Sequence, residues 1–318
     1  MIPIVSIIVT THAVESAIQD CLQSLQQQTL KAIEVLIMND GSSEETARIC
    51  EAFANEDSRF SIMNAQSLTL SEARNYGMHI ATGKYIAFVD GHDFVECTMY
   101  EKLVKCAKQK QADLVLCGYT KYWPKSKYKR HYKVNAALLT KSNPVDYFLA
   151  KHNEAYVMPC NKLFLRSIIL EHQLYFDNPT FFEHVGFMAR YLSFAKVIAI
   201  VNEAQYNQVQ YADMLTKSYH PSIAQSQEQM YIQMKQFFDK RQYRNVIEAL
   251  NLRMYIHRYH YVLLTTANTR HLKSLERQII REGKNFSQLS WKHRLMKPLV
   301  KLRLYPTFFR LVHKVKAE

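Results

Sequence analysis

A chain of 318 residues that is 48% hydrophobic can bury a large core, and its few glycines and prolines (7 and 8) exclude a low-complexity protein. No run of 18 apolar residues occurs, so the sequence predicts no membrane-spanning helix. The net charge of +13 is uneven, because residues 221–318 hold 19 Lys/Arg against 6 Asp/Glu whereas residues 1–220 hold 22 of each. We therefore expect a neutral globular region at 1–220 and a basic region at 221–318 that prefers anionic partners.

Strands and helices alternate along the first 120 residues. Short apolar runs predict strands at residues 4–10, 33–38, 60–63, 85–89 and 112–119. Between them the sequence predicts helices that open at 12–15 and cover 44–55, 70–81 and 99–110. Such alternation indicates βαβ units, so the predicted fold class is α/β with a doubly wound, mostly parallel sheet.

The strand at residues 85–89 ends in a cluster of polar side chains. Its five apolar or aromatic residues are typical of a strand covered on both faces, and Asp90, His92 and Asp93 follow directly. In an open α/β sheet, ligands bind beyond the carboxyl ends of the strands. Two carboxylates and an imidazole there favour a divalent cation that carries a phosphate. The alternative is a solvated loop with a helix N-cap at Asp93 or Thr98.

Several short segments between residues 4 and 95 occur together in a characteristic order. They are Ser6-Ile7-Ile8-Val9, Cys21-Leu22-x-Ser24-Leu25-x-x-Gln28-Thr29, Glu34-Val35-Leu36-Ile37, Asp40-Gly41-Ser42, Ala73-Arg74-Asn75-x-Gly77 and Ala81-x-Gly83-x-Tyr85-Ile86-x-Phe88-x-Asp90. At this spacing the set resembles glycosyltransferase family 2, the bacterial GT-A-type nucleotide-sugar transferases. A weaker match follows at Asn161-Lys162-Leu163-Phe164 and Phe182-Glu183-His184, so the resemblance covers about two thirds of the chain.

The resemblance implies a nucleotide site. Asp40 would accept a hydrogen bond from the base N–H, since a carboxylate offers only acceptors, although a turn-forming Asp is the alternative. His12 stands where the family has an aromatic ring near the base. Arg74 would reach the diphosphate or ribose, and the alternative is an arginine on the surface of its helix. The implied nucleotide-binding residues are Thr10, His12, Asp40, Arg74, Asp90 and Gly91.

A metal site is implied at Asp90-Gly91-His92, which occupies the family's Asp-x-Asp. Asp90 and His92 would hold Mn²⁺ or Mg²⁺, which would neutralise the leaving nucleoside diphosphate. His92 replaces a carboxylate, and imidazole is an acceptable manganese ligand. The alternative is that the metal site is weak or lost.

A second histidine stands at the position of the family's general base. His184 replaces an aspartate there, and an ordinary imidazole pKa of about 6.5 suits that role, while Glu183 would assist or take over. Asn161 and Lys162 match a motif on the acceptor side, with a structural role as the alternative. The two departures to histidine leave open an active variant or an impaired member that acts as a partner subunit or sugar-binding scaffold.

Basic and aromatic residues interleave at 121–133, a pattern found in single-strand nucleic-acid binders. A solvated hairpin is the more common origin of one such cluster, and we expect it to help cover the donor or acceptor. No recognisable nucleic-acid motif accompanies the excess charge of the chain, so we predict no nucleic-acid partner.

The tail combines basic residues with apolar ones. Trp291, Leu295, Leu299 and Leu302 share one predicted helix face, and Phe308 and Phe309 follow after Pro306 among further basic residues. Such helices are typical of proteins that lie on anionic lipid, whereas docking on the same domain or at a homo-oligomer interface is the alternative. Six scattered cysteines and the lack of a signal peptide at Met1 favour a cytoplasmic protein.

These expectations combine into one functional hypothesis. The resemblance implies an inverting transfer from a nucleotide-diphosphate sugar, with UDP as the favoured nucleotide, to a glycan or lipid-linked acceptor. The acceptor would belong to a surface polysaccharide such as capsule, exopolysaccharide or teichoic acid. The basic tail would hold the enzyme peripherally at the inner face of the cell membrane.

Overall fold

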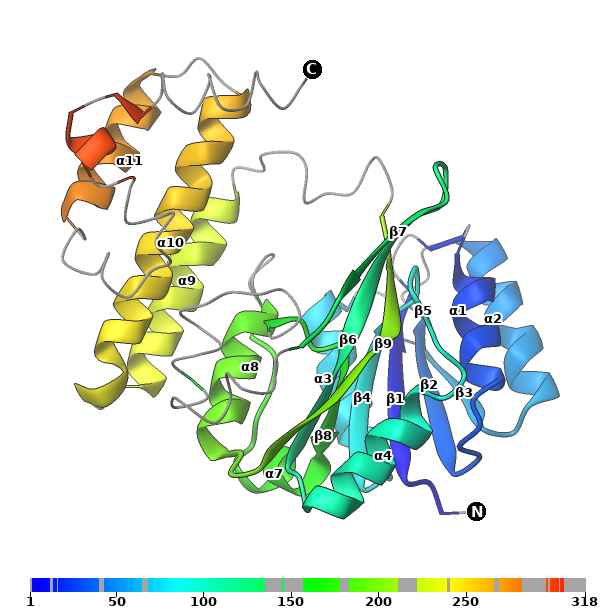
Figure 1. Ribbon diagram of the computed structural model, residues 1–318. Coiled ribbons are helices and arrows are strands. Elements are labelled where there is room, and N and C mark those ends of the chain that lie inside the picture. The colour runs from blue at the N-terminus through cyan, green and yellow to red at the C-terminus, as the bar shows by residue number, and fades with distance from the viewer. Residues whose placement is uncertain are drawn as a thin grey trace. The chain divides into compact units, whose positions relative to one another are not determined.

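The chain of this computed structural model divides into two compact units, which are described separately (Figure 1). The first comprises Met1–Pro144, Asn153–Asn178 and Glu183–Met214, and the second comprises Val145–His152, Pro179–Phe182 and Leu215–Glu318. The residues that the structure describes are 2–11, 14–15, 17–39, 43–64, 68–134, 145, 157–177, 183–210, 222–238, 241–265, 269–281, 296, 298–302 and 304–305. The expectation that 1–220 and 221–318 are separate domains stays a prediction.

The first unit is built on one sheet. In sheet order the strands are β3 (Phe60–Asn64), β2 (Ile33–Asn39), β1 (Val5–Thr10), β4 (Tyr85–Asp90), β8 (Lys162–Leu165), β6 (Leu114–Trp123), β9 (Ile198–Val209) and β5 (Phe94–Val95), with β7 (Tyr128–Tyr132) paired to β6. Strands β1, β2, β3, β4, β6 and β9 run in one direction, and β5, β7 and β8 run against them. The predicted α/β class with a mostly parallel sheet is confirmed.

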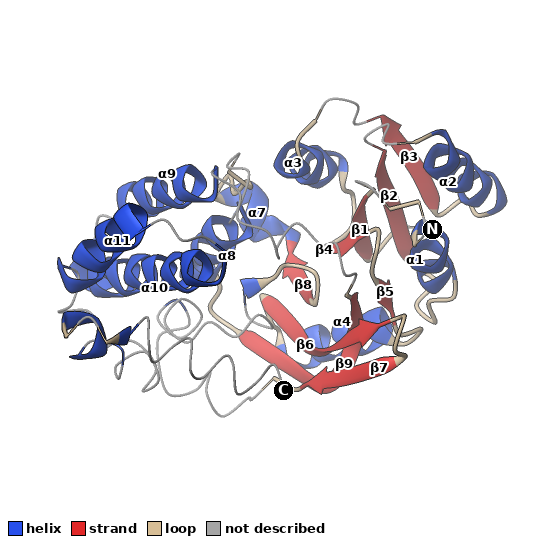
Figure 2. Ribbon diagram, turned by 90° about the horizontal axis from the view of Figure 1, so that it is seen from above, coloured by secondary structure: helices blue, strands red, loops and turns tan. Residues whose placement is uncertain are grey.

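The helices of the first unit lie on both faces of this sheet. They are α1 (Ile18–Gln26), α2 (Glu44–Glu56), α3 (Leu70–Ile80), α4 (Met99–Lys110), α7 (Arg166–Glu171) and α8 (Glu183–Phe194). Viewed from above, α1 and α2 lie on one side of β1 and β2 and α3 lies on the other, as in a doubly wound sheet (Figure 2). Ser43 caps α2, and Thr69 and Glu72 form a capping box that fixes the start of α3.

Two boundaries differ from the sequence-based expectation by more than two residues. The first helix begins at Ile18 rather than at residues 12–15, because the Ala17 N–H donates to the Val14 carbonyl (2.9 Å) and closes a turn before it. Strand β6 continues four residues beyond Tyr119, because that extension pairs with both β7 and β9. The basic segment is therefore a β6–β7 hairpin, as predicted.

An aromatic cluster anchors the strand that ends at Asp90. Phe88 of β4 lies edge-on to Phe164, Phe176 and Phe187, with ring centroids 5.6, 5.2 and 6.0 Å away. These partners come from β8, from the segment before α8 and from α8 itself. The cluster therefore fixes the end of β4 relative to α8, whose first residues are Glu183 and His184.

The second unit contains α9 (Ser222–Phe237), α10 (Arg241–Thr265) and α11 (Thr269–Arg281). One apolar cluster joins α10 and α11 to three residues of the tail, Met296, Val300 and Tyr305. Leu299 packs against this cluster, Leu302 is exposed, and Trp291, Leu295, Phe308 and Phe309 lie outside the described residues. None of the described helices combines the length and apolar character that crossing a bilayer requires.

We expect Phe88→Ala to lower the free energy of unfolding by about 3–5 kcal/mol, because it removes a ring that is 1% exposed and contacts three others. Denaturant unfolding measures the change. Leu170→Ala on α7 is the control, since Leu170 is 48% exposed, and it should cost far less. Equal losses in the two variants would contradict the anchoring role of the cluster.

Candidate active site

The chain turns sharply as it leaves β4. The Asp93 N–H donates to the Asp90 carbonyl (2.8 Å), and the Gly91 N–H donates to the Thr10 carbonyl (2.8 Å). A Cβ at position 91 would lie 2.7 Å from that carbonyl oxygen, so the turn requires glycine. Gly91 thus acts here through its lack of a side chain, and its predicted contact with a nucleotide stays a prediction.

Strand β9 holds Asp93 in place. The Tyr206 hydroxyl donates to one carboxylate oxygen (2.5 Å) and the Val209 N–H donates to the other (2.8 Å). Asp93 is 2% exposed. Burial and the nearby charge of Asp90 raise the pKa of Asp93 to about 7, although His92 and the two hydrogen bonds act in the opposite direction.

Three side chains form a candidate cation site. Asp90, His92 and Asp93 each offer a donor atom, and these atoms lie within 4.8 Å of one another. Two carboxylates and an imidazole suit Mn²⁺ better than Mg²⁺, which prefers oxygen ligands throughout. Asp90 and Asp93 already accept hydrogen bonds, but a carboxylate has about four acceptor positions in all. The three residues therefore fit a divalent cation.

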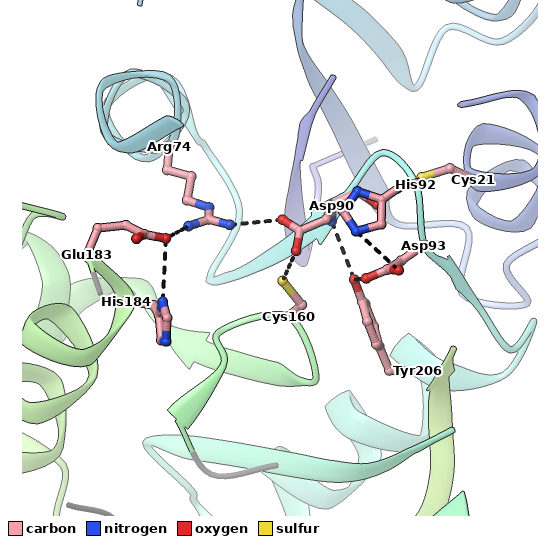
Figure 3. A network of polar contacts seen from close by, with 9 residues as sticks. All are labelled: Cys21, Arg74, Asp90, His92, Asp93, Cys160, Glu183, His184 and Tyr206. Atoms are coloured by element: carbon pink, nitrogen blue, oxygen red, sulfur yellow. Dashed lines mark hydrogen bonds and ion pairs between the residues drawn. The ribbon is translucent and has the colours of Figure 1, made fainter. Parts of the chain in front are cut away.

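A buried arginine connects this cluster to α8 (Figure 3). Arg74 of α3 donates to Asp90 Oδ1 (2.9 Å) and to Glu183 Oε1 (3.0 Å), and it is 3% exposed. Burial lowers the pKa of Arg74, but the charges of Asp90 and Glu183 outweigh it and raise the pKa above its ordinary value. Arg74 is thus a buried bridge and not a surface arginine. Its predicted contact with a diphosphate stays a prediction.

The Glu183–His184 pair lies at the other end of this bridge. Glu183 Oε1 is 3.5 Å from His184 Nδ1, and the His184 side chain is 31% exposed against 11% for Glu183. Burial raises the pKa of Glu183, but the hydrogen bond and charge of His184 and the charge of Arg74 together lower it to about 2. A carboxylate this acidic is a weak base. The imidazole of His184 is also the more accessible member of the pair.

Two residues near Asp90 carry no obvious signal in the sequence. The Cys160 thiol lies 3.4 Å from Asp90 Oδ2, and the Tyr206 hydroxyl lies 3.4 Å from the Asp90 N–H. Burial raises the pKa of the Cys160 thiol well above its ordinary value, so this cysteine stays protonated and donates to the carboxylate. In the sequence, only the family resemblance at the neighbouring Asn161-Lys162 indicated that the segment around Cys160 belongs to the site.

Asn161 and Lys162 are both fully buried. The Lys162 ammonium donates to the Met158 carbonyl (2.6 Å) and to Asn161 Oδ1 (2.7 Å), while Asn161 Nδ2 donates to the Cys117 carbonyl (2.5 Å). Burial lowers the pKa of Lys162 to about 7. These contacts match the structural alternative, and a role on the acceptor side stays a prediction.

The structure describes only some of the residues of the expected nucleotide site. A small pocket lined by Thr10, Met38, Leu70 and Ala73 lies where β1 and β2 end and α3 begins. Thr10 is thus at the carboxyl edge of the sheet, and its predicted contact with a nucleotide stays a prediction. His12 and Asp40 lie outside the described residues, so their contacts with a base stay predictions.

We expect Arg74→Met to lower the free energy of unfolding by about 3–5 kcal/mol, because it leaves Asp90 and Glu183 without their buried partner. The loss should shrink at acidic pH. The pKa of Glu183 is about 2 in the folded protein against 4.5 for an ordinary glutamate, and the charge of Arg74 is one of the causes, after His184. The part of the loss that comes from the Arg74–Glu183 pair is therefore present above pH 4.5 and disappears as the pH falls towards 2.

Urea unfolding at several pH values measures this difference. Arg48→Met is the matched control, because Arg48 forms an exposed ion pair with Glu45 (2.9 Å), and we expect no measurable change in its stability. If Arg74→Met were as stable as Arg48→Met, the bridge would not hold α3, β4 and α8 together.

Comparison with known proteins gives a consistent family assignment. Residues 6–172 match the family Glycosyl transferase family 2. The uncharacterized glycosyltransferase EpsJ of Bacillus subtilis is 44% identical over 38% of this chain and 35% of its own length. The putative glycosyltransferase EpsH of the same organism is 30% identical over 70% of this chain and 66% of its own length. The matches thus leave a third or more of both relatives uncovered.

Solved structures share the fold. The crystal structure of Staphylococcus aureus TarS 1–349 in complex with UDP-GlcNAc covers 98% of this chain, and this chain covers 91% of it, with a TM-score of 0.71 at 16% identity. The mannosyltransferase PcManGT of Pyrobaculum calidifontis, in complex with GDP-Man and Mn²⁺, covers 98% of this chain and is covered to 88%, with a TM-score of 0.53 at 13% identity. The predicted GT-A-type fold is confirmed, and the chain belongs to glycosyltransferase family 2.

Proposed function

We propose that this protein is an inverting glycosyltransferase that moves a sugar from a nucleotide-diphosphate donor to a glycan or lipid-linked acceptor. One observation carries the proposal: Arg74 connects the Asp90 end of the site to the Glu183–His184 pair. The reaction needs a group that receives the leaving diphosphate and a base that activates the acceptor hydroxyl. The two ends of the bridge supply candidates for these two tasks within one polar network.

The donor end would use Asp90, His92 and Asp93. A divalent cation bound there would supply charge neutralisation to the leaving diphosphate. Asp90 and His92 are the accessible members of the group, because the side chain of each is 28% exposed, and His92 lies 3.6 Å from the buried Asp93 carboxylate. UDP is the favoured nucleotide, since TarS, which shares the fold, was crystallised with UDP-GlcNAc.

At the acceptor end, we assign the general base to His184. A neutral imidazole can take the proton of an attacking hydroxyl, and Glu183 holds the ring by its nearby oxygen. The charged Glu183 also stabilises the imidazolium that forms. In a single displacement at the anomeric carbon, the hydroxyl would attack from the side opposite the diphosphate, which inverts the configuration.

The acceptor and the location of the enzyme belong to the same proposal. We place this protein in the synthesis of a surface polysaccharide, and the similarity of part of the chain to the chondroitin synthase of Pasteurella multocida supports a polysaccharide acceptor. The excess of basic residues in 221–318 supports contact with anionic lipid at the inner membrane face. Because Met296, Val300 and Tyr305 pack into the second unit, any contact would involve other tail residues.

For the metal end, we expect His92→Ala to weaken Mn²⁺-dependent binding of UDP by roughly tenfold or more, because it removes one of three donor atoms. His92→Asp should keep or strengthen binding, since it restores the family's carboxylate. Calorimetry with UDP, with and without Mn²⁺, measures both. Equal affinity with and without metal in the wild type and in His92→Ala would remove His92 from the site.

For the base, His184→Ala should reduce transfer by roughly 10²–10⁴-fold while donor binding and folding survive. Wild-type transfer should also fall at acidic pH, because a protonated imidazole cannot accept a proton. The assay is turnover of a panel of nucleotide sugars with Mn²⁺. Full activity in His184→Ala with loss in Glu183→Gln would move the role to Glu183. If the wild type turns over no donor, the scaffold alternative holds.

A further inference from the structure

The β6–β7 hairpin carries a charge that the proposed reaction does not use. Residues 121–133 contain six Lys and Arg and no Asp or Glu. Lys125, Lys127, Lys129 and Arg130 are exposed, and no carboxylate of the described part of the chain forms an ion pair with them. The hairpin is therefore a positive surface available to an anionic ligand.

Aromatic rings lie between these cations. Trp123 faces Tyr128 across the hairpin with ring centroids 5.3 Å apart, and the Lys129 ammonium lies 5.3 Å from the centroid of the Tyr122 ring. Tyr128 is 56% exposed. Residues 121–133 contain no Leu, Ile, Val, Met or Phe. The hairpin thus offers flat rings and cations without any large aliphatic side chain.

The base of the hairpin is joined to the candidate cation site. Tyr122 pairs with Val209 of β9, and the Val209 N–H donates to Asp93. Tyr119 pairs with Tyr206, whose hydroxyl donates to the same carboxylate. From Tyr119 to Trp123 the strand advances about 13 Å at roughly 3.3 Å per residue. Figure 1 shows the hairpin rising beyond the carboxyl end of β4, the edge at which Asp90 and His92 lie.

We propose that this hairpin binds an acceptor glycan that carries phosphate or carboxylate groups. The rings pack against the C–H faces of sugar units, and the lysines pair with the anionic groups along the polymer. This inference rests on the proposed function and specifies the class of its acceptor. Because the base of the hairpin pairs with β9, a polymer bound to the hairpin would be guided towards the Asp90 and His92 end of the site.

The test compares two triple variants that remove the same charge. One changes Lys125, Lys127 and Lys129 of the hairpin to Gln, and the other changes Lys105, Lys108 and Lys110, which are exposed on α4. The probes are poly(glycerol phosphate), alginate as a polyuronate, and neutral dextran of similar length. We expect the hairpin variant to lose roughly tenfold in affinity for an anionic polymer, as three exposed ion pairs would give, and the α4 variant to match the wild type.

Binding of the anionic polymer should also weaken as salt rises, because added ions screen exposed charges. Three results would overturn the inference: equal losses of polymer affinity in the two variants, an affinity for dextran equal to that for the anionic polymers, or no binding of either anionic polymer. So would stronger, hairpin-dependent binding of single-stranded DNA or of phosphatidylglycerol vesicles. Loss of UDP affinity in the hairpin variant would assign these lysines to the donor and would also overturn it.

Turnover of nucleotide sugars by the wild type separates this inference from the proposed function. A protein that turns over a donor but binds no anionic polymer refutes the acceptor class alone. A protein that binds the polymer through the hairpin but turns over no donor refutes the transferase activity and leaves the binding surface in place.

Discussion

The first unit depends on a buried charge balance around Arg74. One guanidinium lies between two carboxylates, Asp90 at the end of a strand and Glu183 at the start of a helix, which are far apart in the sequence. Each partner makes the burial of the others tolerable, because an unpaired charge in this environment is costly. The same contacts fix the backbone segments that carry His92 and His184. In this site, the contacts that join α3, β4 and α8 also set the geometry available for chemistry.

Strand β9 is the second element that serves both fold and site. Along four residues it supplies the Tyr206 hydroxyl and the Val209 N–H to Asp93, and it pairs with β6 beside the base of the hairpin. Asp93 is thereby buried without being unsatisfied, whereas the side chains of Asp90 and His92 are each 28% exposed. The rigidity of the cation cluster therefore comes from a strand more than a hundred residues further along the chain.

Much of this arrangement could be predicted from local sequence patterns. Buried strands such as Tyr85–Asp90, capped helices and the polar residues after β4 follow from periodicity and from the rule that sites lie at the carboxyl edge. The antiparallel insertion of β8 between β4 and β6 could not be predicted, because no local pattern specifies which strands pair. For the same reason Arg74 was expected to face the nucleotide or solvent, whereas its partners are set by tertiary packing. Tyr206 and Cys160 have ordinary strand and loop contexts, so only the fold reveals their contacts with the Asp90 and Asp93 carboxylates.

The two histidines that depart from the family pattern share one arrangement. His92 lies 3.6 Å from the buried Asp93 carboxylate, and His184 lies 3.5 Å from the buried Glu183 carboxylate. Both imidazoles are about 30% exposed, so each has one side towards a fixed carboxylate and another towards solvent. A nearby carboxylate orients an imidazole, which benefits a metal ligand and a general base alike. In the function proposed above, this paired arrangement gives each imidazole a fixed carboxylate neighbour that holds the ring while its other side stays open to a ligand or substrate.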